Sequence, residues 1–418
     1  MSQINYSFAS RPFVITAVIL LFVGSSLGSI WMMKIFGIHI PNDTPIILQL
    51  HKFIQLDGFL TLIIMGIGYM IVPRFRNVSL PFPSISKISY LLIVSSMALK
   101  FFSQVASHDD ASFIGSILRL SGIAIFVGIT MWTMRIRPKL LQKADYFMAS
   151  SMMMLLFTTV VQVSGLSSFN TLTQIQLLLL FPIAMILGIE YKTMPSFLAF
   201  IRPKRRIDDL SICLILASMA MGSVSVFYDS QVISVSFNLL FLSAITAFSI
   251  SLYIYGGFDD KEIRSLIKGE KLVRYNFTIL HTRLAFSFLH VAVVMAVFFS
   301  FFPSFALYDL AIHFTAIGFI GITIMLYLPI LLPPITGKSI QFVQFNKIPL
   351  ALLVGGLTAR AAGDFVIQII PSQLSYIFGF SGWLIVAAML YFVIMIHKSM
   401  GDSVSEDISF NAKRPRKL

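Results

Sequence analysis

The stretch LQLHKFIQLDGFLTLIIMGIGYMIVPRF, residues 48–75, decides the fold class of this chain. The part of it from Phe59 to Val72 carries no charged residue. At about 1.5 Å per residue, the stretch is long enough as a helix to cross the roughly 30 Å hydrocarbon core of a bilayer. Similar apolar runs recur along the 418 residues, of which 57% are hydrophobic and only 12% are charged. Because a soluble domain has about 25% charged residues, the sequence predicts an all-α polytopic membrane protein.

Twelve spans are expected, forming one transmembrane domain over residues 1–400, followed by a basic tail over residues 401–418. The connections are short and show no evident internal repeat, and the first residues lack the pattern of a cleaved signal peptide. The sequence therefore predicts a single twelve-helix bundle. The predicted spans cover residues 12–33, 46–72, 85–103, 113–134, 144–166, 171–200, 208–228, 231–256, 275–302, 306–333, 346–370 and 373–398.

Positive charge is distributed unevenly among the predicted connections. Lys and Arg gather in alternate connections, for example 202–206 and 257–274. The other connections hold few basic residues and include Asp109, Asp110 and Asp229. By the positive-inside rule, the basic connections and both termini are expected on the cytoplasmic side of the cell membrane. This topology accounts for the net charge of +13, so membrane lipid is the expected surrounding and nucleic acid is not an expected partner.

Histidines are the candidate metal ligands. The single cysteine, Cys213, excludes an intramolecular disulfide, a Cys-ligated iron–sulfur cluster and the attachment of c-type haem. His51, His290 and His313 lie in three different predicted spans, and counting along those spans places all three at a similar depth in the outer half of the membrane. His281 is expected near the inner surface. Three imidazoles at matched depth indicate a group held between helices, whereas a core histidine with a local hydrogen bond is the alternative for each.

We predict that this group is haem b, because membrane-buried haem b takes two axial nitrogens from facing helices. His51 and His313 are the expected axial pair. His290 is the candidate ligand of a second haem or metal site.

Cations in the outer halves of three predicted spans are candidates for binding the propionates of haem. They are Arg360, Arg119 and Lys100. Because Asp364 lies four residues after Arg360, an intrahelical ion pair is the alternative for that arginine. Gln55 lies one turn from the first of these histidines, and it is expected either in the pocket or in an interhelical hydrogen bond.

The second predicted span also contains an acid, Asp57, on a different helix face from its histidine. Asp57 lies away from the helix face that carries His51 and Gln55. An unpaired charge in a membrane costs several kcal/mol. Asp57 is therefore expected to pair with another span.

Several of these segments resemble the NnrS family of haem-containing membrane proteins. Residues 51–73 resemble the second helix of that family. IHFTAIGFIGITIMLYLPILLPPITGK, from Ile312, is similar to its H-x-x-x-x-G-x-x-G helix, which ends in T-G-R/K. MPSFLAFIRPKRR, from Met194, is similar to its I-P-F-F-x-R-N helix end. FSFLHVAVVM, with His290, and LTARAAGDF, with Arg360, also fit, so the resemblance spans most of the chain.

The resemblance implies a fold like that of subunit I of the haem–copper oxidases, to which the NnrS family is similar, with haem ligands on the second and tenth of twelve helices. His51 and His313 stand on those two helices. It also implies redox handling or sensing of nitric oxide or a related diatomic. An oxidase-like respiratory subunit with a quinol or cytochrome as electron donor is one alternative, and a secondary transporter is another. No catalytic residue is assigned.

The chain departs from both families where copper would bind. Phe53 and Ile54 stand where NnrS proteins often have a second histidine and an acid, and Ile335 replaces the histidine of their G-H-T-G motif. The sixth and seventh predicted spans lack the histidines of the oxidase copper centre. These departures argue against copper.

Overall fold

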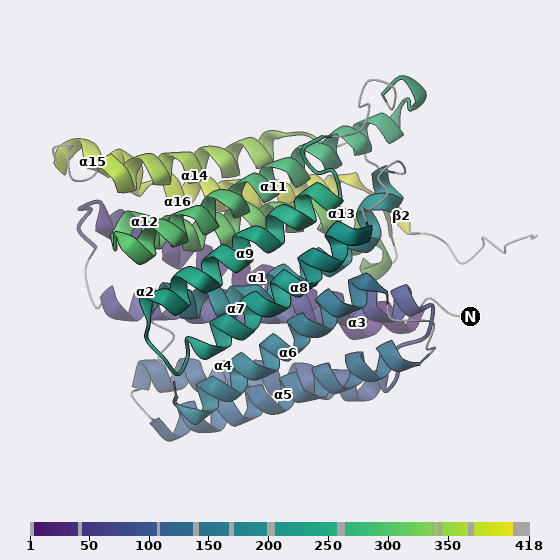
Figure 1. Cartoon of the computed structure of the whole chain (residues 1–418), viewed down its shortest axis with the longest axis horizontal. Coiled ribbons are helices and arrows are strands. Elements are labelled where there is room, and N and C mark those ends of the chain that lie inside the picture. Colours follow the sequence, from purple (N-terminus) through teal and green to yellow (C-terminus); the bar gives the residue numbers. More distant parts are fainter. Residues whose placement is uncertain are drawn as a thin grey trace, which may run out of the picture.

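The protein is a bundle of long helices (Figure 1). The computed structural model describes residues 4–40, 44–106, 109–136, 142–166, 171–198, 205–256, 264–336, 338–340, 345–366 and 372–403. Within these residues, 12 helices are long and apolar enough to cross a membrane, which confirms the predicted multi-pass, all-α architecture. Two short strands, β1 (Lys338–Ile340) and β2 (Met400–Ser403), pair in antiparallel fashion at one end of the bundle.

Most spans are single helices, and three are built from shorter pieces. The second span consists of α2 (Thr44–Phe53), η1 (Ile54–Leu60) and α3 (Thr61–Arg76). The tenth consists of α12 (Phe305–His313), η2 (Phe314–Gly321) and α13 (Ile322–Thr336), and the last consists of α15 (Ser372–Gly379) and α16 (Ser381–Ser399). The single helices are α1 (Ile4–Ile35), α4 (Pro83–Ala106), α5 (Asp109–Arg135), α6 (Lys143–Ser164), α7 (Leu172–Leu198), α8 (Arg205–Val224), α9 (Gln231–Ser251), α11 (Glu270–Phe301) and α14 (Ile348–Val366).

The second and tenth spans share an irregularity. Each contains a π-helical segment, η1 or η2, in which the helix is locally wider than an α-helix. The segment η1 begins three residues after His51, and η2 begins directly after His313. Segments of this kind rotate the residues on either side relative to each other and are frequent at functional sites.

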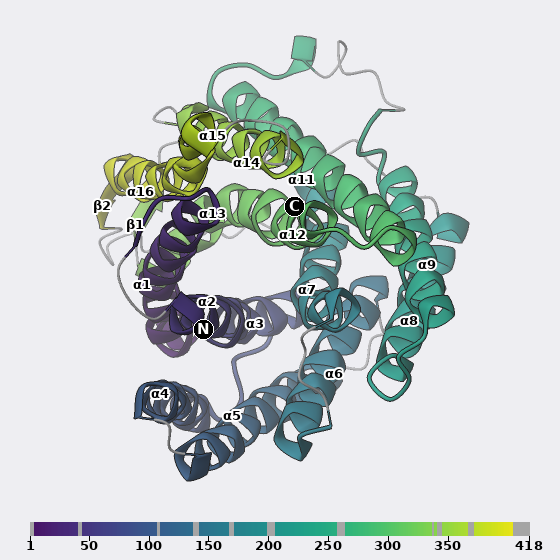
Figure 2. The ribbon, with the colours of Figure 1, turned by 90° about the vertical axis from the view of Figure 1, so that its left-hand side faces the viewer.

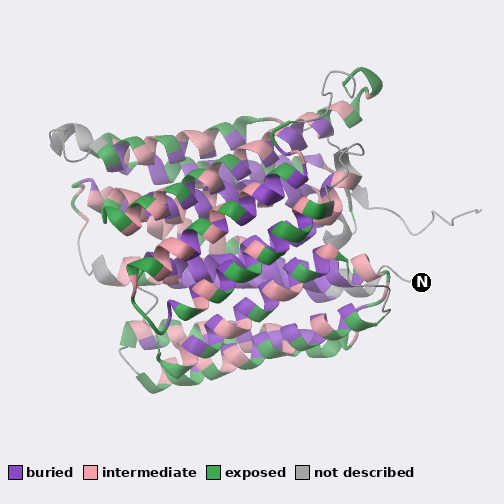
Figure 3. Ribbon diagram, in the orientation of Figure 1, coloured by how far each residue is buried: buried purple, intermediate pink, exposed green. Residues whose placement is uncertain are grey.

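The core of the bundle is formed by α7 and by the second span. In their most apolar windows, 94% and 89% of the residues are buried, compared with 17% in α4 (Figure 3). A helix that is apolar all round is typical of such a core position. Seen from its end, the bundle places α1, α2, α3, α7, α12 and α13 around its centre, with α4–α6, α8, α9, α11 and α14–α16 outside them (Figure 2).

The two ends of the bundle differ in charge. We call the end at which α3, α5, α7, α9, α13 and α16 finish the basic end, because the basic connections lie there. The other is the opposite end. The predicted topology assigns the basic end to the cytoplasm.

Candidate functional site

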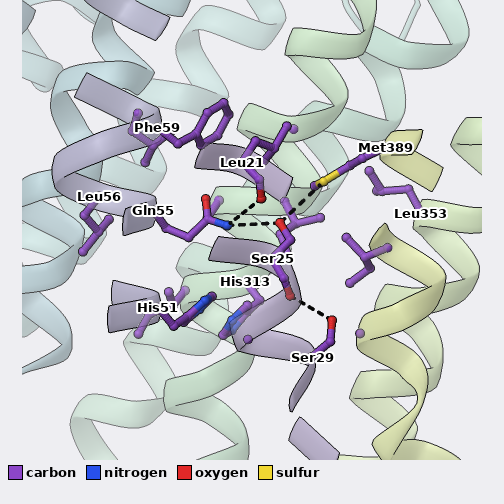
Figure 4. Close-up of a pocket in the computed structure, with 18 of the residues that line it drawn as sticks. Leu21, Ser25, Ser29, His51, Gln55, Leu56, Phe59, His313, Leu353 and Met389 are labelled. Carbon is purple, nitrogen blue, oxygen red and sulfur yellow. Dashed lines mark hydrogen bonds between the residues drawn. The ribbon is translucent and has the colours of Figure 1, made fainter. Parts of the chain in front are cut away.

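Two imidazole rings line one cavity between the helices. The cavity has a volume of about 220 Å³ and is lined by residues of α1, the second and tenth spans, α7, α14 and α16. Its walls are mostly aliphatic and aromatic. His51 and His313 both line it, with ring centroids 6.4 Å apart and ring planes within 9° of parallel (Figure 4). The structure therefore brings together the two histidines that were predicted as a pair.

Both rings are held through Nδ1. Nδ1 of His51 lies 2.7 Å from the carbonyl oxygen of Gly24, and Nδ1 of His313 lies 2.8 Å from that of Asp309. A carbonyl oxygen only accepts hydrogen bonds, so each Nδ1 carries the proton and donates. In a neutral imidazole with this tautomer, Nε2 keeps its lone pair and can bind a metal.

The same hydrogen bond occurs in histidines outside the cavity. Nδ1 of His281 donates to the carbonyl of Phe277, and Nδ1 of His290 donates to that of Phe286, one turn earlier in α11 in each case. A bond to the preceding turn is thus common to helical histidines of this chain. What distinguishes His51 and His313 is the shared cavity.

Glycines of α1 make room for the residues of the second span. A Cβ atom on Gly28 would lie 2.6 Å from Cε1 of His51, and one on Gly24 would lie 2.8 Å from Nε2 of Gln55. Gln55 lines the cavity and donates a hydrogen bond to the hydroxyl of Ser25, at 3.0 Å. Sequence reasoning missed this α1 surface, although a small-xxx-small pattern such as GSSLG is a known signal of close helix packing.

A buried ion pair supports His313. Arg360, which lines the cavity, donates to both carboxylate oxygens of Asp309, at 2.6 and 2.7 Å. Oδ1 of Asp309 also lies 3.2 Å from Nδ1 of His313. Sequence reasoning named Arg360, which lines the cavity, but missed Asp309, whose position four residues before His313 was the available signal.

The other two predicted propionate ligands lie elsewhere. Arg119 and Lys100 pair with Asp57, at 2.5 and 3.8 Å, and neither lines the cavity. Arg119 also donates to Gln162 of α6. The prediction that Asp57 pairs with another span is confirmed, and its partners are the cations that were expected at the haem.

His290 does not join the histidine pair. It does not line the cavity, and its ring packs against Tyr255, whose hydroxyl lies 3.3 Å from Nδ1 of His290. Tyr255 follows α9 at the basic end, and the nearby Arg283 donates to the carbonyl of Ile254. His290 lies in the second half of α11 (Glu270–Phe301), the half nearer the opposite end, and what separates it from the histidine pair is its contact with Tyr255.

The histidine pair fits an iron porphyrin better than a bare metal ion. Within the described residues, no three His, Cys, Asp or Glu side chains form a metal-binding group. A porphyrin supplies four nitrogens itself and needs only two from the protein. Metal–imidazole bonds of about 2 Å on each side, with ring centres about 1 Å further back, give an expected centroid separation of about 6 Å. The observed 6.4 Å and the apolar walls agree with that requirement.

Comparison with known proteins finds one family. A family model described as "Domain of unknown function (DUF8744)" matches residues 153–400, more than half of the chain. The matched region begins within α6 and includes His313, Asp309 and Arg360, whereas His51 lies before it. No curated protein matches the chain.

Proposed function

The chain belongs to the DUF8744 family, and we propose that it is a membrane haem protein in which His51 and His313 are the axial ligands of one haem b. The observation that carries this proposal is the pair of parallel rings, 6.4 Å apart, that line one largely apolar cavity. Both rings are anchored through Nδ1, which leaves both Nε2 atoms available. A hydrogen-bonded core histidine needs neither a second ring nor a cavity.

The surrounding residues orient the two ligands. The ring of His51 donates a hydrogen bond to the Gly24 carbonyl, and it packs closely against α1 because Gly28 has no side chain. The backbone and carboxylate of Asp309 hold the ring of His313. Among the described residues, Lys52 and Arg360 are cations that line the cavity, so they replace Arg119 and Lys100 as candidates for contacts with the propionates.

The proposed role is one-electron redox chemistry. Bound haem supplies an iron that alternates between the ferric and ferrous states. With an imidazole on each face of the ring, the residues favour electron transfer over gas binding, since neither axial position is left open. The resemblance to NnrS, which rests on the quoted motifs, adds nitric oxide or a related diatomic as the compound whose redox handling the protein serves.

The alternatives receive less support. An oxidase-like subunit would need a copper centre beside the haem, and the described residues hold no three-ligand group for it. A secondary transporter would need no paired imidazoles. The charge pattern supports a cell-membrane location with the basic end in the cytoplasm.

The proposal is tested by the reduced-minus-oxidised absorption spectrum of the purified full-length protein. We expect a haem b spectrum that is lost or strongly altered in His51→Ala and His313→Ala. His281→Ala and His290→Ala are matched controls, because both histidines make the same Nδ1–carbonyl bond outside the cavity. A colourless wild-type protein would favour the transporter. Loss of haem in His290→Ala, together with a normal haem spectrum in His51→Ala, would contradict the assignment of His51 as a ligand and point to a haem site at His290.

A further inference from the structure

Two cations and one carboxylate meet where η1 packs against α4 and α5. Oδ1 of Asp57 lies 2.5 Å from Nη1 of Arg119, and Oδ2 of Asp57 lies 3.8 Å from Nζ of Lys100. The side chain of Asp57 is 14% exposed, that of Arg119 is 5% exposed and that of Lys100 is 13% exposed. With both bases protonated, this cluster carries one positive charge more than its carboxylate compensates.

The surrounding helices supply no second carboxylate among their described residues. In α1, the second span, α4, α5 and α6, the other described acids are Asp109, Asp110 and Asp145. The first two are exposed in the first turn of α5, and even the nearer one, Asp110, lies about 14 Å from Arg119 along the helix. Asp145 lies at the basic end and pairs with Arg76. Because an uncompensated charge inside a membrane costs several kcal/mol, the surplus calls for an anion.

Hydrogen-bond donors of the cluster also remain without an acceptor. Nε of Arg119 has no hydrogen-bond partner among the described residues, and this residue is only 4% exposed. Its Nη1 donates to Oε1 of Gln162, so the NH₂ group of that amide keeps N–H donors for another acceptor. Nζ of Lys100 has three N–H donors and lies too far from Asp57 for a short charge-assisted bond. A buried donor without an acceptor indicates a water molecule or an ion that the chain does not supply.

A glycine of α5 brings the two cations to one interface. A Cβ atom on Gly115 would lie 3.0 Å from Cγ of Lys100, so the stem of this lysine packs directly on α5. Arg119 follows Gly115 by one helical turn and lies on the same face of α5. Both cations therefore lie at the contact of α4 with α5, where they approach Asp57.

The surroundings of Lys100 indicate the class of anion. Phe101, Phe102 and Val105 follow it in α4 and are 47%, 53% and 59% exposed, as expected for side chains that contact lipid tails. Lys100 lies about 9 Å before the end of α4 at Ala106. The phosphate of a lipid stays at the level of the headgroups, above these side chains. A small free anion with a single charge fits this depth and the surplus of one positive charge.

We propose that the cluster of Asp57, Arg119 and Lys100 binds a small monovalent inorganic anion such as chloride. The anion accepts hydrogen bonds from Nε of Arg119 and from Nζ of Lys100, and it compensates the charge that Asp57 leaves over. It thereby fixes η1 against α4 and α5 and stabilises the bundle. This inference does not depend on haem, because neither cation lines the cavity.

The first test is thermal unfolding of the purified full-length protein at constant ionic strength, with sodium chloride or sodium bromide in place of sodium gluconate. The unfolding temperature should rise with either halide and reach a plateau, because a ligand that binds the folded state stabilises it. Lys100→Gln should remove this rise, and Lys100→Arg should retain it. Lys87→Gln, at an exposed cation of the same helix, is the matched control and should respond as the wild type does. Equal halide responses in Lys100→Gln and Lys87→Gln would overturn the site.

The second test measures binding directly, with radioactive chloride. The wild type should bind chloride saturably, bromide should displace it, and Lys100→Gln should lose the binding. Asp57→Asn should bind chloride more tightly, because the surplus rises from one positive charge to two. Two opposite effects in one cluster are expected only where charge drives the binding. A wild type that binds no chloride, as would follow if Lys100 were neutral, would overturn the proposal. Stabilisation by an anionic phospholipid and not by chloride would overturn it as well.

Discussion

At the scale of single residues, the two proposed ligands are held in different ways. His51 donates to a neutral carbonyl of another helix, and His313 lies beside a carboxylate that is paired with Arg360. A carboxylate near Nδ1–H makes an imidazole a more basic ligand. The sequence pointed to both histidines and to Arg360, because rare polar residues in an apolar chain stand out. It did not identify Gly28 or Asp309, whose roles depend on which helices become neighbours.

Gly28 should be essential for the position of His51. In Gly28→Ala, the new Cβ would lie 2.6 Å from Cε1 of His51, so the ring must move. We expect reduced haem content and an altered spectrum in the purified variant. Gly128→Ala is the matched control, because nothing lies within 4 Å of a Cβ there. That variant should keep its haem, with stability unchanged or higher by up to about 1 kcal/mol. A normal spectrum in Gly28→Ala would contradict the packing described for His51.

Asp309 and Arg360 should shift the haem potential in opposite directions. Asp309→Asn removes a negative charge beside His313 and should raise the midpoint potential. Arg360→Gln removes a positive charge and should lower it. Both variants should also unfold more easily, by up to about 3–5 kcal/mol, because each leaves a buried charge without its partner. Redox titration and thermal unfolding check both effects, and shifts of the same sign would contradict an electrostatic role for the pair.

At the scale of elements, the π-helical segments determine how the histidine-bearing spans are rotated. Both segments begin within a few residues of a proposed ligand. The sequence predicted the existence and approximate limits of these spans from apolar length alone. It could not predict the segments, because no residue pattern in η1 or η2 distinguishes a π-helical turn from an α-helical one. For the same reason, residue counting estimated depths but not which face of each helix points inward.

The cluster of Asp57, Arg119 and Lys100 should stabilise the packing of helices and should not contribute to haem binding. It links η1 to α4 and α5, and its two cations line no part of the cavity. Arg119→Gln should therefore lower the unfolding temperature and leave the haem spectrum and midpoint potential close to those of the wild type. Thermal unfolding and redox titration of the same preparation check this. Haem loss at unchanged stability would instead support the original expectation that Arg119 binds a propionate.

At the scale of the whole molecule, a twelve-helix bundle was predictable because bilayer thickness imposes the length of each apolar segment. The charge asymmetry of the connections was equally visible in the sequence. The arrangement around the centre was not, because it depends on contacts between helices far apart in the chain. His290 illustrates the limit: its depth could be counted along the chain, but its packing against Tyr255 depends on which helices become neighbours.

The orientation of the bundle can be tested with single cysteines. In a Cys213→Ser background, Asp229→Cys lies between α8 and α9 at the opposite end, and Lys268→Cys lies before α11 at the basic end. The positive-inside rule predicts that a membrane-impermeant maleimide labels position 229 in intact cells and position 268 only after permeabilisation. The reverse pattern would invert the proposed topology.

The central claim is that two imidazoles bind one iron from opposite sides, and electron paramagnetic resonance of the oxidised, purified full-length protein tests it most directly. Two imidazole ligands predict a low-spin ferric signal at one haem per chain, unchanged by added nitric oxide. In His313→Ala, this signal should be replaced by a high-spin signal or be lost. A wild-type protein that is high-spin, or that contains no haem when produced with a full haem supply, would contradict the account.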